Sequence, residues 1–130
     1  MPNFSKSSAD RLSTCDSRLQ QVCNDAIEIL DFTVLCGNRS KVDQDLAVAQ
    51  GKSRTPYPTS KHNTLPSRAV DIAPYPIDWN DIERFKALNE VMQSCAEKRG
   101  IKLNWGGNFT KLKDYDHWEL SDEEIKKCSE

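Results

Sequence analysis

Residues 114–120 read Asp-Tyr-Asp-His-Trp-Glu-Leu, and within them residues 117–120 alternate polar and apolar side chains. Such alternation is typical of a β-strand that turns one face to a core and the other face away from it. Short apolar segments bounded by turn residues are typical of further strands, and the chain has three of them, at residues 32–36, 69–73 and 101–105. The sequence therefore predicts a sheet built from segments that lie far apart in the chain.

Helical periodicity separates these strands. Apolar side chains recur every three or four residues over residues 19–30, which Asp16 is placed to cap, and again over residues 81–99. Asn80 and Glu83 resemble a capping box at the start of the second helix. Helices of this kind beside short strands indicate the α+β class.

Shorter features complete the predicted architecture. Residues 41–49 have the composition of a short helix that ends at Gly51, and residues 121–130 that of a short acidic helix. Residues 1–10 are polar and are expected to form a flexible leader. Because 130 residues is the size of one domain, we expect a single small α+β domain over residues 1–130, with helices packed on an antiparallel sheet.

The composition excludes several classes of protein. With 37% hydrophobic and 29% charged residues the chain is expected to fold, and its net charge of -2 argues against general binding to nucleic acid. No long apolar run or signal-peptide stretch occurs, so we expect synthesis in the cytoplasm and no stable membrane association. The five cysteines are scattered and odd in number, which favours free thiols. The chain is also expected to be a monomer.

A basic segment precedes the strand at residues 69–73. Residues 46–70 contain no acidic side chain and carry four Lys or Arg side chains, which are Lys52, Arg54, Lys61 and Arg68. We interpret this segment as the approach for an anionic substrate, with a solvated basic loop as the alternative.

The two histidines are the strongest chemical signal from the residues themselves. His62 lies in a Pro- and Ser-rich loop before the strand that holds Asp71, and His117 begins the last strand. A catalytic zinc site takes three such ligands and leaves a fourth position open. If the two strands are neighbours, Asp71 and His117 converge on one face and the loop brings His62 over them. From spacing alone, a structural role for both histidines stays open.

The segments around these residues resemble a known family. Their order is that of the zinc D-alanyl-D-alanine carboxypeptidases and L-alanyl-D-glutamate endopeptidases, a family that includes phage endolysins. The segments are Phe-Thr-Val-Leu-Cys-Gly-Asn-Arg-Ser at 32–40, Ser-Lys-His at 60–62, Ser-Arg-Ala-Val-Asp at 67–71, Leu-Asn-Trp-Gly-Gly at 103–107 and Asp-Tyr-Asp-His-Trp-Glu-Leu at 114–120. His62 and Asp71 are farther apart than is common in the family, a difference that a loop absorbs at small cost.

The resemblance implies a zinc ion held by His62, Asp71 and His117, and a general base at Asp114. Zinc activates water and polarises the scissile carbonyl, while the base takes the proton of that water and returns it to the leaving amine. Asp116 is the competing candidate for the base. On a strand its side chain points opposite to that of His117, so a structural or solvent-facing role is expected.

Further side chains are expected to hold the substrate or the ligands. The resemblance implies that Arg39 binds an anion, and Arg68 is a second candidate clamp, since a guanidinium offers two parallel donors to a carboxylate. Ser60 is expected either to hydrogen-bond the substrate or to brace its loop. Glu119 shares the face of His117 and either supports that ligand or lines the sheet.

Together these features predict a zinc peptidase that acts on the peptide stem of peptidoglycan. The favoured bond is that between L-Ala and D-Glu, with release to the wall through a separate membrane pore during phage lysis. The alternatives are a D-alanyl-D-alanine carboxypeptidase or dipeptidase, a non-catalytic zinc-binding cell-wall module, and a binding protein without metal. Asp114 favours the enzyme, because a binding module needs no base.

Overall fold

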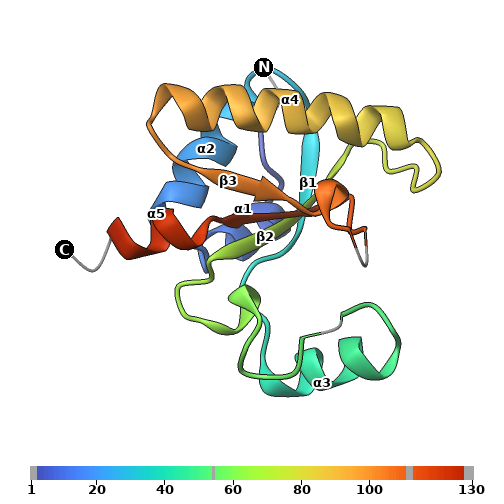
Figure 1. Ribbon diagram of the computed structural model, residues 1–130. Coiled ribbons are helices and arrows are strands. Elements are labelled where there is room, and N and C mark those ends of the chain that lie inside the picture. The colour runs from blue at the N-terminus through green and yellow to red at the C-terminus, as the bar shows by residue number, and fades with distance from the viewer. Residues whose placement is uncertain (1–2, 54, 111–112, 128–130) are drawn as a thin grey trace.

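Four strands form one antiparallel sheet at the centre of the molecule (Figure 1). The computed structural model describes residues 3–53, 55–110 and 113–127. Along the sheet the strands lie in the order β1 (Phe32–Cys36), β2 (Ala69–Pro74), β4 (His117–Leu120) and β3 (Leu103–Trp105). The predicted α+β class and antiparallel sheet are confirmed. Strand β3 begins later than expected, because the amide of Ile101 still bonds the carbonyl of Ala96 in the preceding helix.

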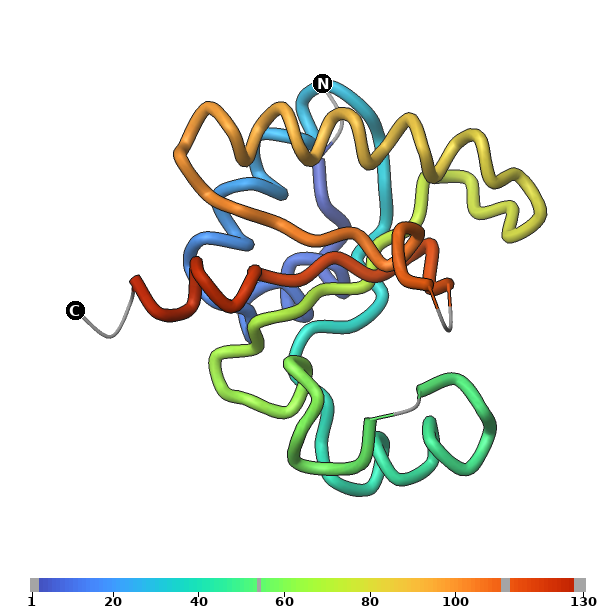
Figure 2. Tube along the Cα trace, in the orientation of Figure 1, coloured from blue at the N-terminus to red at the C-terminus, as the bar shows by residue number. Residues whose placement is uncertain are grey.

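Helices α2 (Ser17–Ile27) and α4 (Ile82–Lys98) pack against each other, and α4 lies across the sheet, as the traces in Figures 1 and 2 show. The core joins their apolar stripes to one face of β2 and β4. Its fully buried side chains include Leu19, Val22, Ala26, Phe85, Leu88, Met92, Val70, Ile72, Trp118 and Leu120. Alternation along β2 and β4 sends these strand residues to the core and their neighbours to the opposite face.

The predicted cap of α2 is confirmed, and that of α4 is wrong. The carboxylate of Asp16 accepts a hydrogen bond from the amide of Arg18 at 2.9 Å. At the start of α4 the cap position is Asp81, and its side chain makes no capping bond. Asn80 belongs to the preceding turn, where its amide donates to the carboxylate of Asp78 at 3.0 Å. Asn80, which the sequence pattern assigned to the cap of α4, is therefore part of the preceding turn.

Helix α1 (Lys6–Leu12) corrects the expectation of a flexible leader over residues 1–10, of which residues 1 and 2 lie outside the described part. The helix packs along β1. Ser8 is buried there, and its hydroxyl accepts a hydrogen bond from the amide of Val34 at 3.0 Å. A polar composition does not reveal this contact, because a buried hydroxyl is tolerated once it is hydrogen-bonded.

At the other end of the chain, α5 (Asp122–Lys127) lies within the segment predicted as a short acidic helix. Residues 128–130, including the predicted free thiol of Cys128, fall outside the described residues. The described cysteines are free thiols, as predicted, and they are Cys15, Cys23, Cys36 and Cys95. Among the helices that the structure describes, none has the length and apolar composition needed to cross a membrane.

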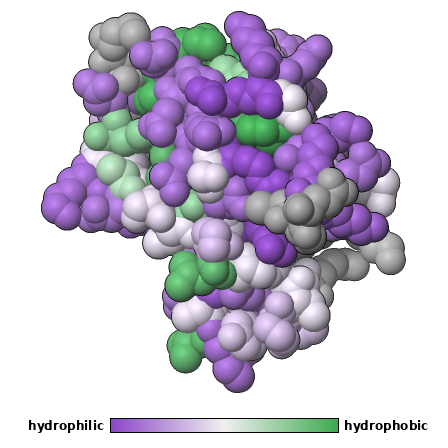
Figure 3. Space-filling model, turned by 90° about the vertical axis from the view of Figure 1, so that its left-hand side faces the viewer, coloured by the Kyte–Doolittle hydropathy of each residue, from purple (hydrophilic) through white to green (hydrophobic). Residues whose placement is uncertain are grey.

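Residues 40–53 and 55–66 form a lobe on the opposite side of the sheet from α4, and the lobe projects below the body of the molecule in Figures 1 and 3. It holds α3 (Lys41–Ala49) and the short 3-10 helix η1 (Lys61–Asn63). Gly51 ends α3 with a φ of 75°, a left-handed conformation that favours glycine. Only Gln44 of α3 is buried, so this helix adds little to the core.

Candidate metal centre

Asp71 and His117 lie directly opposite each other where β2 pairs with β4. Opposite residues of an antiparallel pair send their side chains to the same face of the sheet. On β1, an irregularity after Val34 brings Cys36 opposite Asp71 as well. The three side chains therefore form a row across three adjacent strands, on the face away from the core.

His62 reaches this row from η1 in the lobe. Ser60 caps η1, and its hydroxyl accepts a hydrogen bond from the amide of His62 at 3.2 Å. The imidazole Nδ1 of His62 lies 2.7 Å from the carbonyl oxygen of Gly37. Only 2% of the surface of His62 is exposed. Ser60 therefore holds its backbone amide and Gly37 its ring in a buried position.

Three side-chain atoms from these residues form a nearly equilateral triangle. His62 Nε2 lies 3.1 Å from Asp71 Oδ1 and 3.2 Å from His117 Nδ1, and the distance from His117 Nδ1 to Asp71 Oδ1 is 3.1 Å. Two ligands of a tetrahedral zinc ion lie about 3.3 Å apart when each is about 2.0–2.1 Å from the metal. The triangle therefore has the dimensions of one face of a zinc coordination tetrahedron.

In each ring, the nitrogen outside the triangle determines whether the nitrogen in the triangle carries a proton or a lone pair. His62 Nδ1 faces the Gly37 carbonyl, and His117 Nε2 lies 2.8 Å from the carboxylate Oε1 of Glu119. Both partners only accept hydrogen bonds, so both outer nitrogens carry the proton. In their neutral forms the rings then direct two lone pairs at a carboxylate oxygen. Three acceptors converging on one point fit a cation, and imidazole with carboxylate is a donor set that zinc uses.

The charges of these residues favour a cation at the triangle. Burial lowers the pKa of His62, but the Asp71 carboxylate outweighs burial and raises that pKa to about 10. Burial raises the pKa of Asp71, but the charges of His62 and His117 outweigh it and hold the pKa well below its usual range. The carboxylate therefore stays ionised and favours a positive charge beside it.

Asp114 lies next to the triangle. One of its carboxylate oxygens is within 4.8 Å of ligand atoms of both Asp71 and His117, and the side chain lines a cavity of about 640 Å³. Its backbone is held by η2 (Gly106–Asn108), where the amide of Asp114 donates to the carbonyl of Gly106 at 3.0 Å. A Cβ atom on Gly106 would overlap the carbonyl of Asp114. The glycine of the Trp-Gly-Gly turn thus allows the close approach that positions the predicted base.

Asp116 contacts Asp114 through its side chain, and both residues line a second cavity of about 500 Å³. Burial, followed by the hydrogen bond to Asp114, raises the pKa of Asp116 to about 9. A protonated Asp116 can donate a hydrogen bond to the side chain of Asp114 and so hold that side chain in position. This geometry agrees with the structural role expected for Asp116.

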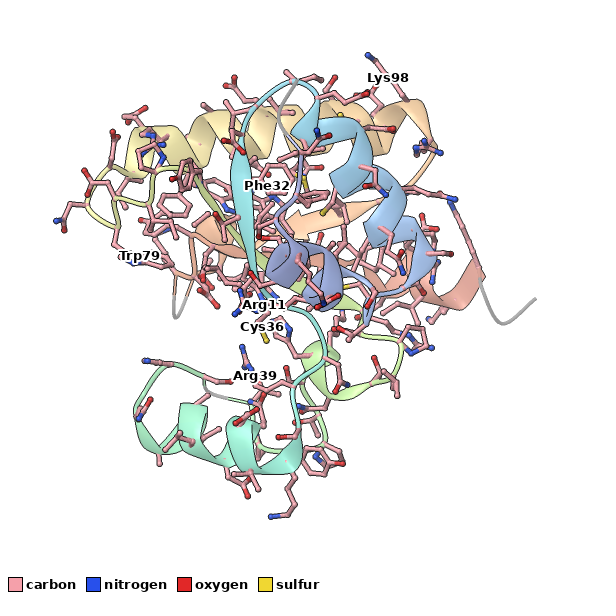
Figure 4. The ribbon with its side chains drawn as sticks, turned by 180° about the vertical axis from the view of Figure 1, so that it is seen from behind. Arg11, Phe32, Cys36, Arg39, Trp79 and Lys98 are labelled. Atoms are coloured by element: carbon pink, nitrogen blue, oxygen red, sulfur yellow. The ribbon has the colours of Figure 1, made fainter. Side chains whose placement is uncertain are left out.

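Arg39 is bound within the site. Its Nη2 lies 3.2 Å from Asp71 Oδ2, and its Nη1 donates to the Oε1 of Gln44 at 3.0 Å. Figure 4 shows Arg39 and Cys36 between the sheet and the α3 lobe. Since Oδ1 of Asp71 faces the histidines, Arg39 occupies the second oxygen of that carboxylate. Arg39 also lines the larger cavity, so it borders the space open to a substrate.

The structure separates the two remaining predicted substrate residues. Ser60 lines the larger cavity while its hydroxyl braces the loop. Arg68 is not among the described side chains that line this cavity, and its charge acts on Asp16 instead. The position of Arg68 outside this cavity wall gives no support to a role as substrate clamp, which stays a prediction.

Comparison with known proteins assigns the fold and site to a family. The model of the phage L-alanyl-D-glutamate peptidase family matches residues 2–126. The chain belongs to this family. The L-alanyl-D-glutamate peptidase of Escherichia phage T5 is 36% identical over 118 residues, which cover 86% of this chain and 85% of the phage protein. The crystal structure of the Serratia marcescens L-Ala D-Glu endopeptidase ChiX matches with a TM-score of 0.81 and 28% identity, covering 94% of this chain and 92% of that one.

Membership of the L-alanyl-D-glutamate peptidase family confirms the resemblance found in the sequence. It also confirms that the chain is a peptidase of the class that acts on cell-wall peptide. The predicted ligand, base and clamp residues lie in segments that the family model covers.

The sequence did not indicate Gln44 as a site residue of this peptidase. Its amide Nε2 donates to the Ser53 hydroxyl at 3.0 Å and to the Thr55 carbonyl at 2.6 Å, while its Oε1 accepts from Arg39. Gln44 therefore ties α3 to the cavity wall. No periodicity could have found it, because the apolar residues of α3 are exposed and the polar one is buried.

Proposed function

We propose that this chain is a zinc-dependent endolysin that hydrolyses the bond between L-Ala and D-Glu in the peptide stem of peptidoglycan. The observation that carries the proposal is the triangle of His62 Nε2, Asp71 Oδ1 and His117 Nδ1, with edges of 3.1–3.2 Å, beside the carboxylate of Asp114. The names of the phage T5 and Serratia relatives support the choice of bond.

Different residues of the chain have different roles in the proposed hydrolysis. A zinc ion held by His62, Asp71 and His117 would supply Lewis acidity toward the scissile carbonyl and the attacking water. Asp114 accepts a proton from that water and returns it to the amine of the leaving D-Glu. Asp116 donates a hydrogen bond to the side chain of Asp114 and holds it in position. Arg39 holds Asp71 in place and borders the cavity that receives the peptide.

The phage relative supports a place for this activity in cell lysis. In this proposal the monomeric enzyme is made in the cytoplasm of an infected cell and reaches the wall through a separate membrane pore. Its partner is the peptide stem, and neither nucleic acid nor a stable membrane anchor takes part.

Digestion of purified peptidoglycan tests the proposal. We expect new D-Glu amino termini, identified by mass spectrometry, and loss of these termini when a chelator removes zinc. Free D-Ala as the sole product would establish a carboxypeptidase instead. A wall left intact by zinc-loaded protein would favour a binding module.

A further inference from the structure

The larger cavity leaves one lysine without an ionic partner. Three described Lys and Arg side chains line it, and two of them are paired within the site. Arg39 pairs with Asp71, and Lys61 pairs with Glu119 at 2.6 Å. For Lys52 no ion pair or side-chain hydrogen bond occurs among the described residues, and its side chain is exposed. An unpaired cation at the wall of a substrate cavity is available to an anionic ligand.

The backbone around Lys52 fixes where this charge enters the cavity. The amide of Lys52 donates to the carbonyl of Ala47 at 2.8 Å, across the left-handed turn at Gly51. This bond ends α3 in a defined conformation. The neighbouring Ser53 is held by Gln44 through its hydroxyl. The ammonium of Lys52 is therefore carried by a long side chain whose backbone is held in place.

Lys52 shares both cavities with the predicted base. Asp114 and Lys52 line the larger cavity together, and they also line the second cavity. A base that protonates the leaving amine must lie beside the residue that supplies that amine. In the proposed reaction that residue is D-Glu. The D-Glu side of the substrate thus lies on the Lys52 side of the site.

Carboxylates dominate the walls around that position. Asp43, Asp71, Asp114 and Asp116 line the second cavity. They would repel a second carboxylate on the substrate unless a cation offset them. Lys113 also lines this cavity, but its Nζ is directed to the carbonyls of Gly107 and Phe109 at 3.3 and 3.5 Å. Of the two described lysines that line the second cavity, Lys52 is the one whose ammonium has no hydrogen-bond partner among the described residues.

We propose that Lys52 binds the free carboxylate of the D-Glu residue and makes the enzyme selective for D-Glu over its amide. The assignment rests on the proposed function. Once the nitrogen of D-Glu is acylated by L-Ala and one of its carboxyls is joined to the rest of the stem, one carboxylate remains for an ammonium to recognise. Lys52 is a binding residue for that group and takes no part in proton transfer.

The test compares two stem peptides that differ in one group. One carries D-Glu with its free carboxylate, and the other carries the same residue with that carboxylate converted to an amide. We expect Lys52→Gln to raise the KM of the acid peptide about tenfold with little change in kcat, since it removes a charge-assisted bond to bound substrate. The same substitution should leave the KM of the amide peptide unchanged.

Lys41→Gln is the matched control. It removes the same charge from an exposed lysine of α3 that pairs with Asp45, and it should affect neither peptide. Zinc content measured for each variant checks that the metal site is intact. Equal KM increases for both peptides after Lys52→Gln, or a wild-type enzyme that does not distinguish them, would overturn the assignment while the proposed function stands. If the wild-type enzyme cleaves neither peptide, the proposed function itself fails.

Discussion

His117 Nε2 donates to the carboxylate of Glu119 at 2.8 Å, two residues farther along the same strand. The other oxygen of that carboxylate lies 2.6 Å from the ammonium of Lys61. Lys61 adjoins His62 in the chain, so the contact ties the loop that carries one predicted ligand to the strand that carries the other. The Lys61 ammonium also bonds the carbonyl of Leu120 at 2.8 Å. The orientation of both rings therefore depends on a pair of charges outside the triangle of His62, Asp71 and His117.

Replacing Glu119 should weaken metal binding without removing a ligand. Glu119→Gln is expected to lower zinc affinity about tenfold or more, because the carboxylate orients His117 and makes it more basic. Competition with a chromogenic chelator measures the affinity. Glu123→Gln is the control, since Glu123 is exposed on α5 and pairs only with Lys102 among the described residues. Equal zinc affinity in both variants would show that Glu119 merely lines the sheet.

Purified protein should contain one zinc ion per chain. His117→Ala should lose it, because two donors of the triangle hold zinc far less tightly than three. Elemental analysis of protein prepared without chelator gives the stoichiometry. Protein without stoichiometric zinc would remove the metal from the mechanism.

Asp114→Asn should keep the zinc and the fold while lowering kcat about a hundredfold or more, as expected when a positioned base is lost. Asp116→Asn should reduce kcat much less, since an amide can still donate a hydrogen bond to Asp114. Single-turnover kinetics on a stem peptide separates the two variants. A larger loss from Asp116→Asn would reassign the base.

Gly106→Ala should also reduce kcat, although Gly106 contacts no predicted ligand atom. The added Cβ would overlap the Asp114 carbonyl, so the loop must move and carry the base with it. Zinc content should remain at one ion per chain. Unchanged kcat would mean that the loop relaxes without displacing the carboxylate.

Glu124 provides a test of stability outside the site. Burial raises the pKa of this carboxyl, but the Lys102 amide and the Arg18 and Lys127 side chains outweigh burial and bring the pKa below its usual value. A lowered pKa stabilises the fold above the pKa of the unfolded chain, and this stabilisation is lost as the pH falls through the folded value.

Glu124→Gln should therefore lower the free energy of unfolding by about 1–2 kcal/mol at pH 7, as for loss of a buried charged hydrogen bond. Below about pH 4 the difference from wild type should shrink, since both proteins then lack the charge. Denaturant titrations across this pH range give the values. A difference that does not depend on pH would assign the effect to packing.

The strands, the long helices and the three residues that meet in the triangle could be predicted from the sequence. Alternation along residues 117–120 places His117 and Trp118 on opposite faces, and that inference needs no tertiary information. The order of the motifs also indicated the family, which the comparisons confirmed. The strands and helices follow from local signals, because periodicity and turn composition are properties of a few consecutive residues, whereas the ligand set follows from the resemblance to the family.

Tertiary structure alone decided which distant groups meet. Strand register placed Asp71 opposite His117 and Cys36 opposite Asp71, and sequence periodicity does not specify the partner of a strand. Folding of the lobe buried Gln44 and joined Lys61 to Glu119. Pairing between charges 58 residues apart depends on where the chain returns in space, so the sequence determined the residues of the site and the tertiary structure determined the partners that hold them.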